Sequence, residues 1–299
     1  MQPDVAETCE LIRAFHRRRN FAMEQRKRAN LALMAFLRTQ SGWQRDEPKT
    51  NEGTARNAKA AAKAKAMVMA ADRIAQGKEA VPPEGYAEWA GLIEGSVLAR
   101  KPFDDIEASA TKEMERLAAT LPVWRSWGEG IRGFSARGLA VIVGEAGALS
   151  NYATHSKLWK RMGVAVMGQG DGLFDHRQGN PGPGASAADW INEAYSRRRR
   201  SRLFVIGDGL VKTAGPYREV YLARKAYEVA RAEELGLIVA PSAKIPAKRK
   251  AEFRSVGHIH RRAQRYMEKR LLRDLWRAWR PQSYVTVEEG TAILARYAA

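Results

Sequence analysis

Hydrophobic residues recur at helical spacing along the first part of the chain. From Val5 to about Arg38 there is no Pro or Gly, and a seven-residue repeat fits the segment. The repeat positions are Ile12, Phe15, Arg19, Ala22, Arg26, Ala29, Leu33 and Phe36. This pattern predicts one long helix with a coiled-coil-like seam, which Ser41-Gly42 ends. Because Arg19 and Arg26 make the middle of the seam polar, we expect a weak zipper that needs a partner helix.

Two further helices are predicted before the middle of the chain. Residues from Ala55 to Gln76 are rich in Ala and Lys, which favour a helix, although we expect this helix to pack little. A second helix is predicted from about Pro102 to Thr120, with the proline in its first turn and acidic residues near its positive end. Its apolar face holds Phe103, Ile106, Ala110, Met114, Leu117 and Leu121. This face can pair with the first helix as an antiparallel hairpin.

The composition of the sequence changes after Pro122. Gly becomes frequent, and short apolar runs such as Leu139 to Val143 and Leu203 to Ile206 appear. We therefore predict two domains, residues 1–121 and residues 122–299. Between Gly168 and Gly184, six Gly and two Pro argue against regular structure and predict a long loop. Long ordered loops are often functional, and the alternative is a disordered surface excursion.

Positive charge is concentrated late in the chain. The 299 residues include 51 Lys and Arg against 33 Asp and Glu, a formal net charge of +18. Residues 194–280 hold 23 of the basic and 8 of the acidic residues, and therefore +15 of that charge. A polyanion is the expected partner, and nucleic acid is the first candidate. A membrane surface would attract the same charge, but no apolar run approaches the roughly 18 residues that a spanning helix needs.

Other chemistry is sparse. The first residues have neither the basic start nor the apolar core of a secretory signal, so we expect a cytoplasmic, nucleoid-associated protein. Cys9 is the single cysteine, which excludes an intramolecular disulfide and predicts a packing role. His258 and His260 lie two residues apart, but a metal ion is disfavoured there because Arg261 and Arg262 adjoin them and acidic partners are missing.

Two basic clusters carry most of the charge. The first is Arg197-Arg198-Arg199-Arg200 with Arg202, and the second runs from Arg261 to Arg280. In the second, apolar residues recur every four positions at Ile259, Ala263, Met267, Leu271 and Leu275. The neighbouring basic stripe is Arg262, Arg265, Lys269, Arg273 and Arg277. One face of this helix thus packs against the protein and the other presents cations. Binding of nucleic acid to these cations should depend steeply on salt. Tyr266, Trp276 and Trp279 are candidates for stacking on bases, or else core aromatics.

A turn with small residues lies at the start of the second half. The segment from Ile131 to Ala140 follows one helix and opens another, as in a helix-hairpin-helix, where backbone N–H groups point at a phosphate. Gly133 fits that motif, whereas Arg132 stands where Pro is usual and Ser135 where a second Gly is usual. The alternative is a plain corner between two helices.

In context, these segments resemble a known family. The residues that carry the resemblance are Ile131 to Ala140, Val141 to Gly147, Tyr152-Ala153, Lys157-Leu158-Trp159 and Met162-Gly163-Val164, followed by Tyr195 to Ser201. Together they resemble the C-terminal domain of the insertion sequence 110 family of transposases, which also takes in sequences 116 and 902. The helices from Leu11 to Arg38 and from Pro102 to Leu121 resemble that family's coiled-coil region.

The resemblance implies a DNA transposase or recombinase guided by a structured RNA. In that family an N-terminal RuvC-like domain holds Mg²⁺ with four acidic residues, and the C-terminal domain supplies a nucleophilic serine. We expect this chain to lack the RuvC-like domain, so Mg²⁺ would be used only with a metal site from a partner chain. Gln178 stands where the serine would be, and a carboxamide cannot form the phosphodiester-linked intermediate. Three other serines remain as candidates for the nucleophile: Ser186, Ser196 and Ser201. Each of their hydroxyls can also be interpreted as structural.

The sequence therefore predicts a mainly α protein, with a coiled-coil-like helical hairpin followed by a helical domain that contains the helix-hairpin-helix. We expect a transposase-like protein without autonomous strand cleavage that binds DNA, or structured RNA, and forms a homo-oligomer through its N-terminal helices. One alternative is an active recombinase that uses a remaining serine or a metal site from a partner chain, and another is a purely structural protein that packages RNA or DNA. The predicted nucleic-acid-binding residues are Arg132, Gly133, Ser135, Arg137, Lys157, Lys160, Arg161, Arg177, Arg197, Arg198, Arg199, Arg200, Arg261, Arg262, Arg265, Lys269 and Arg273.

Overall fold

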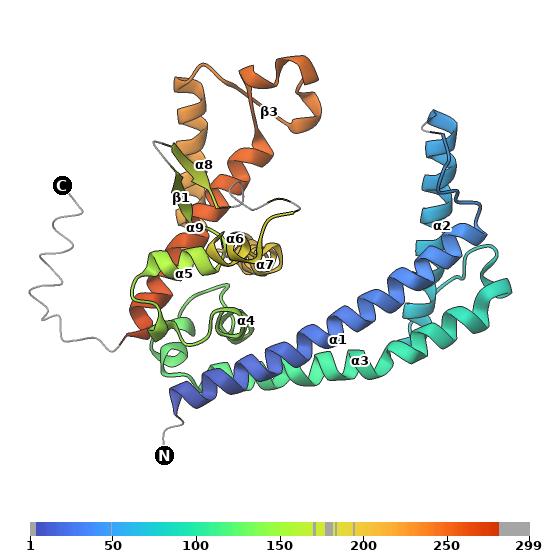
Figure 1. Ribbon diagram of the computed structural model, residues 1–299, viewed down its shortest axis with the longest axis horizontal. Helices are drawn as coiled ribbons and strands as arrows, with labels where there is room; N and C mark the ends of the chain where they lie inside the picture. The colour runs from blue at the N-terminus through green and yellow to red at the C-terminus, as the bar shows by residue number, and fades with distance from the viewer. Residues whose placement is uncertain are drawn as a thin grey trace, which may run out of the picture. The chain divides into compact units, whose positions relative to one another are not determined.

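The computed structural model describes residues 4–48, 50–169, 172–176, 182, 184–193 and 195–280. Most of these residues are helical (Figure 1), which confirms the prediction of a mainly α fold. The chain forms two compact units, one from Met1–Ala14 with Met114–Ala299 and one from Phe15–Glu113. The change from one unit to the other falls inside two long helices, whereas the sequence placed a domain boundary after residue 121.

The elements follow one another along the chain. The first three helices are α1 (Val5–Gln40), α2 (Asn51–Ala75) and α3 (Tyr86–Thr120). Then come a π-helix η1 (Trp124–Gly128), α4 (Ala136–Ala146), a 3-10 helix η2 (Leu149–Asn151), α5 (His155–Arg161), strands β1 (Val166–Gln169) and β2 (Gly172–Asp175), and α6 (Ala187–Glu193). The last part holds α7 (Arg197–Lys212), α8 (Pro216–Glu234), β3 (Ile238–Ala240), the 3-10 helices η3 (Ser242–Lys244) and η4 (Ala247–Glu252), β4 (Phe253–Ser255) and α9 (Val256–Trp279).

In the unit Phe15–Glu113, helices α1 and α3 run antiparallel and in contact. The polar positions of the α1 seam find partners on α3: the Nε of Arg19 donates to the Oγ1 of Thr111 at 3.0 Å. Arg26 forms ion pairs with Asp104 at 3.0 Å and with Glu107 at 2.8 Å. The partner helix that the weak zipper needs is thus supplied within the chain. The coiled-coil character of the pair, and a homo-oligomer formed through it, stay predictions.

Helix α2 packs more closely than its composition indicated. It begins after Thr50, whose Oγ1 accepts from the backbone N–H of Gly53 at 3.1 Å. Its Ala64 and Met67 are buried in a cluster with Leu37 of α1 and Ile93 of α3. Small alanine side chains let the helix axes approach, so an Ala-rich face still buries apolar area against larger neighbours. The expectation that this helix packs little was therefore wrong.

The third helix begins well before the predicted start. It runs from Tyr86 through Pro102, which sits in its interior and not in its first turn. A proline there removes one N–H and leaves the carbonyl four residues earlier without its helical donor. Leu98, which carries that carbonyl, is 72% exposed, so water can solvate the group. Ile93 and Val97 of α3 are buried in the core shared with α1 and α2, and this packing offsets the loss.

Helix α9 is the centre of the larger unit. It contacts α5, α7 and α8, and α8 lies beside it in Figure 1. Its Met267 and Leu271 are fully buried, as the four-residue apolar repeat predicted. Leu158 of α5 and Leu203 of α7 belong to the same buried set. The long helix therefore provides the surface on which the shorter helices assemble. Cys9 is buried in this unit as a free thiol, in keeping with a packing role.

Two short strand pairs were missed from the sequence. Strands β1 and β2 pair antiparallel with Val166 opposite Asp175, inside the segment predicted to be loop. Strands β3 and β4 pair parallel, with Ile238 opposite Phe253. Strands of only three or four residues carry too little alternation to be distinguished from loop in the sequence.

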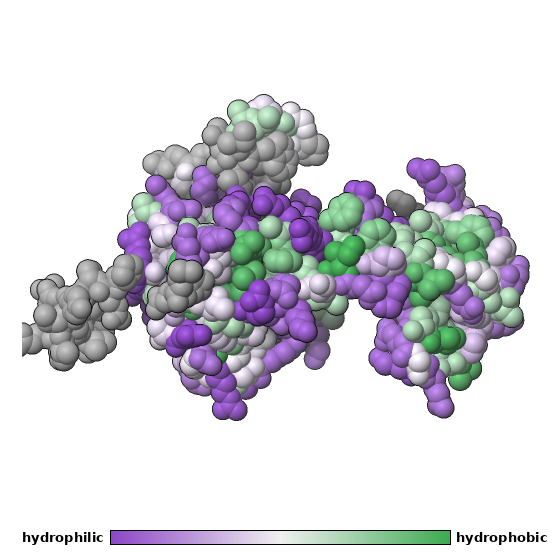
Figure 2. All heavy atoms as spheres, turned by 90° about the horizontal axis from the view of Figure 1, so that it is seen from below, coloured by the Kyte–Doolittle hydropathy of each residue, from purple (hydrophilic) through white to green (hydrophobic). Residues whose placement is uncertain are grey.

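No helix in the described part of the chain combines the length and apolar character needed to span a bilayer. On the face of the molecule drawn in Figure 2, hydrophilic side chains surround separate apolar patches.

Candidate nucleic-acid interface

A hollow of about 490 Å³ lies between the start of α7 and the first half of α9. It is lined by Gly163, Tyr195, Arg197, Arg200, Ser201, Phe204, Val205, Arg261 and Arg265. Four of these residues are arginines, and none is acidic. The two basic clusters of the sequence, sixty residues apart, therefore meet at one concave surface.

Local structure explains how each cluster faces the hollow. The Oγ of Ser196 accepts from the backbone N–H of Arg199 at 3.3 Å and caps α7. Arg197 and Arg200 are then three residues apart on one face, and Arg261 and Arg265 are four apart on α9. The positive end of the α7 dipole adds to this charge instead of offsetting it. An anion in the hollow would relieve the repulsion.

One buried carboxylate stands behind the arginines. Glu268 is fully buried, and its Oε2 lies 2.8 Å from the Nη1 of Arg200. Burial raises the pKa of Glu268 to about 7, while the charges of Arg200 and Arg265 act to lower it. Burial likewise lowers the pKa of Arg265, which Glu268 partly offsets. The charge of the hollow therefore depends on whether Glu268 is ionised.

Close packing of α7 on α9 buries that carboxylate. A Cβ at Gly207 would lie 2.7 Å from the Oε1 of Glu268 and 2.9 Å from the Nε2 of Gln264, so glycine permits the approach. The same Nε2 donates to the backbone carbonyl of Phe204 at 2.9 Å. A larger residue at position 207 would have to displace the side chains of Glu268 and Gln264.

Tyr195 is held at the edge of the hollow by small and aromatic neighbours. Gly163 has a φ of +74°, and a Cβ there would lie 3.2 Å from the Cε2 of the tyrosine ring. The buried His176 meets the other side of Tyr195 edge-on, with ring centroids 5.2 Å apart. The Nε2 of His176 is 2.5 Å from the backbone carbonyl of Glu193. The aromatic ring is thus fixed next to the guanidinium groups.

Comparison of the chain with family models, curated proteins and solved structures finds no match.

Several predicted cations are engaged inside the protein. Glu145 forms ion pairs with Arg199 at 3.4 Å and with Arg202. Its backbone carbonyl accepts from the Nε of Arg161 at 3.1 Å. Burial, followed by the charge of Arg161, lowers the pKa of Arg199. Arg199 and Arg161 therefore stabilise the contact of α4, α5 and α7 and differ from the expectation that they project toward phosphates. Arg197 and Arg198 of the same run are exposed.

The basic stripe of α9 is also partly engaged. Arg262 pairs with Glu228 of α8 at 2.9 Å, and Arg273 pairs with its neighbour Asp274 at 2.9 Å. The Nζ of Lys269 lies 4.4 Å from the centroid of the Trp159 ring. Burial, followed by the charges of Arg265 and Arg224, lowers the pKa of Lys269. Arg262 is exposed, whereas Lys269 and Arg273 are half-buried. The single solvated cationic face that the sequence indicated is therefore interrupted at Lys269 and Arg273, by a ring from α5 and a carboxylate of α9 itself.

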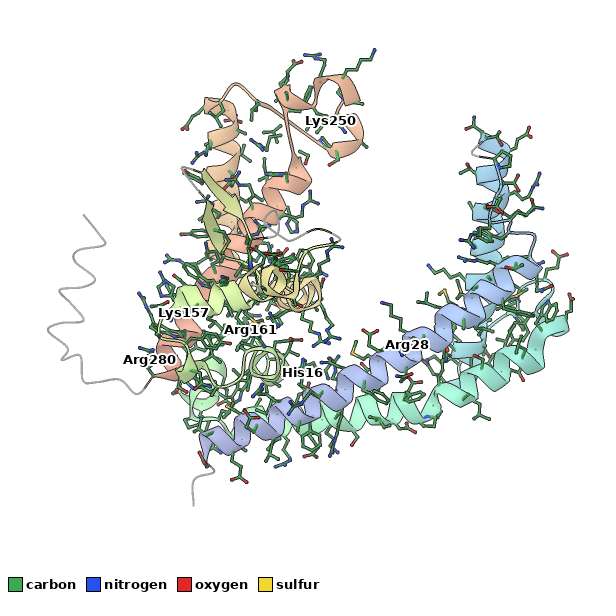
Figure 3. The ribbon with its side chains drawn as sticks, in the orientation of Figure 1. His16, Arg28, Lys157, Arg161, Lys250 and Arg280 are labelled. Atoms are coloured by element: carbon green, nitrogen blue, oxygen red, sulfur yellow. The ribbon has the colours of Figure 1, made fainter. Side chains whose placement is uncertain are left out.

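Trp276, one of the three aromatic residues considered for stacking on bases, has a structural role. The indole Nε1 of Trp276 donates to the backbone carbonyl of Tyr152 at 2.8 Å. Arg280 lies over its ring at 4.0 Å and His155 meets it at 5.7 Å. Figure 3 places Arg280 near Lys157, in the region of α5 and away from Lys250. Lys157 is exposed and Lys160 half-buried, so α5 presents a separate, smaller basic area.

The predicted hairpin turn uses its backbone groups within the protein. The N–H of Phe134 donates to the carbonyl of Ile131 at 3.0 Å, and the N–H of Gly138 donates to the Oγ of Ser135 at 3.1 Å. Gly133 has a φ of +89°, and a Cβ there would lie 2.9 Å from the Cβ of Thr213 at the end of α7. This glycine is thus required for a close approach of two segments, and phosphate binding by the turn stays a prediction. Arg132 and Arg137 are exposed, and Arg137 pairs with Glu115.

The candidate nucleophiles differ in their surroundings. Gln178, which the resemblance aligns with a nucleophilic serine, and the neighbouring Arg177 lie outside the described residues. The Oγ of Ser186 donates to Asp189 at 2.7 Å and accepts from the backbone N–H of that residue at 3.2 Å. Ser196 caps α7. Ser201 is exposed and lines the arginine hollow, which makes it the serine placed nearest to the proposed phosphate site.

The histidine pair serves packing between helices. The Nδ1 of His260 lies 2.8 Å from the phenolic oxygen of Tyr221 on α8. Burial, followed by the charges of neighbouring basic residues, lowers the pKa of both His258 and His260. Within the described residues, no three His, Cys, Asp or Glu side chains are grouped so that they could hold a metal ion.

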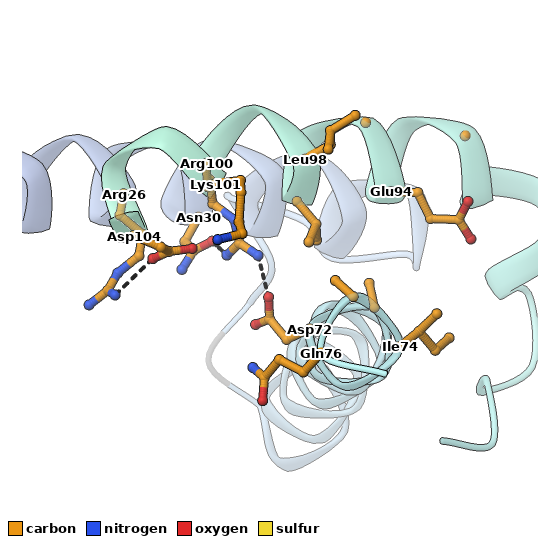
Figure 4. Close-up of a pocket in the computed structure, with 15 residues that line it drawn as sticks. Arg26, Asn30, Asp72, Ile74, Gln76, Glu94, Leu98, Arg100, Lys101 and Asp104 are labelled. Carbon is orange, nitrogen blue, oxygen red and sulfur yellow. Dashed lines mark hydrogen bonds and ion pairs between the residues drawn. The ribbon is translucent and has the colours of Figure 1, made fainter. Parts of the chain in front are cut away.

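A second hollow lies in the unit Phe15–Glu113, between α1, α2 and α3 (Figure 4). Its charged lining residues are Arg26, Asp72, Glu94, Arg100, Lys101 and Asp104. These include three cations and three carboxylates, and the buried Arg100 pairs with Asp72. A hollow with balanced charge offers little attraction to a polyanion. The arginine hollow of the other unit is therefore the better candidate for a site that attracts a polyanion.

Proposed function

We propose that this protein binds nucleic acid and that the arginine hollow between α7 and α9 holds its phosphate backbone. The observation that carries the proposal is the convergence of Arg197, Arg200, Arg261 and Arg265 on one concave surface without an acidic lining residue. Guanidinium groups bind phosphate oxygens in pairs of hydrogen bonds and stay charged at every relevant pH. Such contacts position a nucleic acid without reading its sequence. DNA, or a structured RNA, is the proposed partner.

We further propose that the protein is transposase-like and lacks autonomous strand cleavage. The support comes from the sequence, where Gln178 stands at the family's serine position. The capping bonds of Ser186 and Ser196 support the structural interpretation of these two hydroxyls.

A second candidate is an active recombinase that uses Ser201. Its position among the arginines of the hollow favours it, because guanidinium groups there would stabilise the charge that develops on an attacked phosphate. In that case the Ser201 Oγ would attack a backbone phosphorus and form a phosphoserine diester to one end of the strand. The bond from that phosphorus to the other sugar oxygen would break, and this oxygen would leave as a free hydroxyl that takes up the serine proton. Incubation of the protein with DNA and Mg²⁺, followed by denaturing electrophoresis, decides between the two. Protein–DNA adducts that disappear in Ser201→Ala would establish the recombinase.

The binding proposal is tested by a salt titration. Each neutralised phosphate releases counterions, so four contacts predict a slope of about −3.6 in log K against log salt for duplex DNA. Between 50 and 200 mM salt, the affinity of the full chain for a duplex should fall by about a hundredfold. Fluorescence anisotropy of a labelled oligonucleotide measures this. An affinity that is insensitive to salt over the range would contradict a phosphate-binding site.

A further inference from the structure

We propose that a tyrosine–arginine ladder on α8 and α9 stacks the unpaired bases of a single-stranded nucleic acid. The ladder consists of Tyr227, Arg224, Tyr266 and Arg270. The inference rests on the proposed nucleic-acid-binding function, and it adds the type of strand that this part of the protein prefers.

The four side chains alternate ring and cation. The guanidinium carbon of Arg224 lies 4.4 Å from the centroid of the Tyr227 ring and 4.8 Å from that of Tyr266. Arg270 lies 5.8 Å from the Tyr266 centroid. One guanidinium is therefore shared between two aromatic rings that come from different helices. These distances lie within the roughly 6 Å range of cation–π contacts, so rings and guanidinium groups form one continuous surface on which a base can stack.

A buried carboxylate fixes the ladder in place. The Nε and Nη2 of Arg224 donate to the Oε1 of Glu228 at 2.9 and 2.5 Å. The Nε of Arg262 lies 2.9 Å from the Oε2 of the same residue, and Glu228 is 5% exposed. Two guanidinium groups thus neutralise one buried charge, and Arg224 cannot turn away from the rings. A platform that is ordered before binding loses little conformational entropy when a base arrives.

The exposure of the rings separates them from the structural aromatics. Tyr227 is 47% exposed and Tyr266 is 37% exposed. Trp276, in contrast, gives its indole N–H to a backbone carbonyl and is covered by Arg280. The hydroxyl of Tyr227 accepts from the Nη1 of Arg231 at 3.0 Å, which places another cation next to the ring. Half-exposed rings flanked by arginines are typical of surfaces that bind single strands.

The physical argument favours unpaired bases over a duplex. Every base has a π-face, so stacking on tyrosine tolerates any sequence and contributes on the order of 1–3 kcal/mol per base. In a duplex these faces are already stacked on neighbouring base pairs. The ladder therefore distinguishes the two strand types, whereas the arginine hollow contacts the phosphates of both.

The experiment compares strand types in Tyr227→Leu and Tyr266→Leu. Affinities of the full chain are measured at one salt concentration for an unpaired oligonucleotide of about 20 nucleotides and for a duplex of the same length. Each variant should lose about tenfold for the single strand and less than about twofold for the duplex, with the salt slope unchanged, because no phosphate contact is removed. If Tyr266→Leu lowers the thermal stability, the more exposed Tyr227 carries the test.

Two controls make the outcome decisive. Tyr227→Phe keeps the ring and should retain single-strand affinity, and Leu222→Ala removes an exposed apolar side chain of the same helix without touching the ladder. Equal losses for duplex and single strand, or no loss for either, would overturn the stacking role while leaving the proposed function standing. If the unmodified protein binds neither strand type at low salt, the proposed function fails and the ladder proposal fails with it.

Discussion

Replacing the four arginines of the hollow should reduce duplex affinity by about a hundredfold at 50 mM salt and make the salt slope shallower by about 3 to 4. The variant carries Gln at Arg197, Arg200, Arg261 and Arg265. It also carries Glu268→Gln, because a buried carboxylate that loses its partner would destabilise the fold. The loss should be similar for unrelated sequences, since phosphate contacts carry no sequence information. Electrophoretic mobility shift and fluorescence anisotropy measure both quantities.

The control for this variant removes the same net charge from other places. Arg125→Gln, Lys244→Gln and Lys250→Gln together lower the charge by three, as the hollow variant does. All three side chains are exposed, and none lines the hollow. We expect the control to lose less than about threefold, because dispersed charges act mainly through long-range attraction that salt screens. A loss as large as that of the hollow variant would show that binding follows overall charge, and the localised site would be refuted.

Glu268 should make the stability of the folded chain depend on pH. Its pKa is about 7 in the folded chain and near 4.5 when the residue is solvated. Between these pH values the folded state holds one proton more than the unfolded state, so this residue makes stability fall as pH rises from about 4.5 to about 7. Above pH 7 its contribution is constant. Glu268→Gln resembles the protonated form and should be more stable than the unmodified protein by about 3 kcal/mol at pH 8, and little different at pH 4.5.

Nucleic-acid affinity should change in the same window. Protonation of Glu268 between pH 8 and pH 6 leaves Arg200 without its counter-charge and makes the hollow more positive. We expect affinity to rise by about tenfold on this acidification, beyond any rise shown by Glu268→Gln, which has no carboxyl group to titrate. Both proteins contain the same histidines, so the difference between their pH profiles isolates Glu268. If the unmodified protein and Glu268→Gln have parallel pH profiles both for binding and for urea unfolding, Glu268 is not the group that titrates.

The apolar repeat of α9 predicted its buried face because Ile259, Met267 and Leu271 recur at the period of the helix itself. The long N-terminal helix was predicted for the same reason, and its polar positions indicated that a partner helix was required. Propensity was less informative where tertiary contacts compensate for a local cost. Pro102 remains inside α3, and the alanines of α2 belong to a shared core.

At the candidate site, too, the sequence predicted some features and the tertiary contacts decided others. The sequence located the positive charge late in the chain, but it did not indicate which arginines are engaged with carboxylates. Arg199 and Arg262 pair with Glu145 and Glu228, residues that lie at least thirty positions away. Tyr227 carried no signal at all, because its ladder depends on a tyrosine and an arginine from another helix. Non-local pairs of this kind have no period and leave no trace in one sequence.

By itself, then, the sequence determined where helices form and where the cations lie, since periodicity and composition are local properties of the chain. The tertiary structure alone decided which cations face solvent and which side chains meet. Packing α7 on α9 through Gly207 places Arg197 and Arg200 beside Arg261 and Arg265, and it buries Glu268 behind them. Charge becomes a site only when helices distant in sequence bring the guanidinium groups to one surface and remove the acids from it.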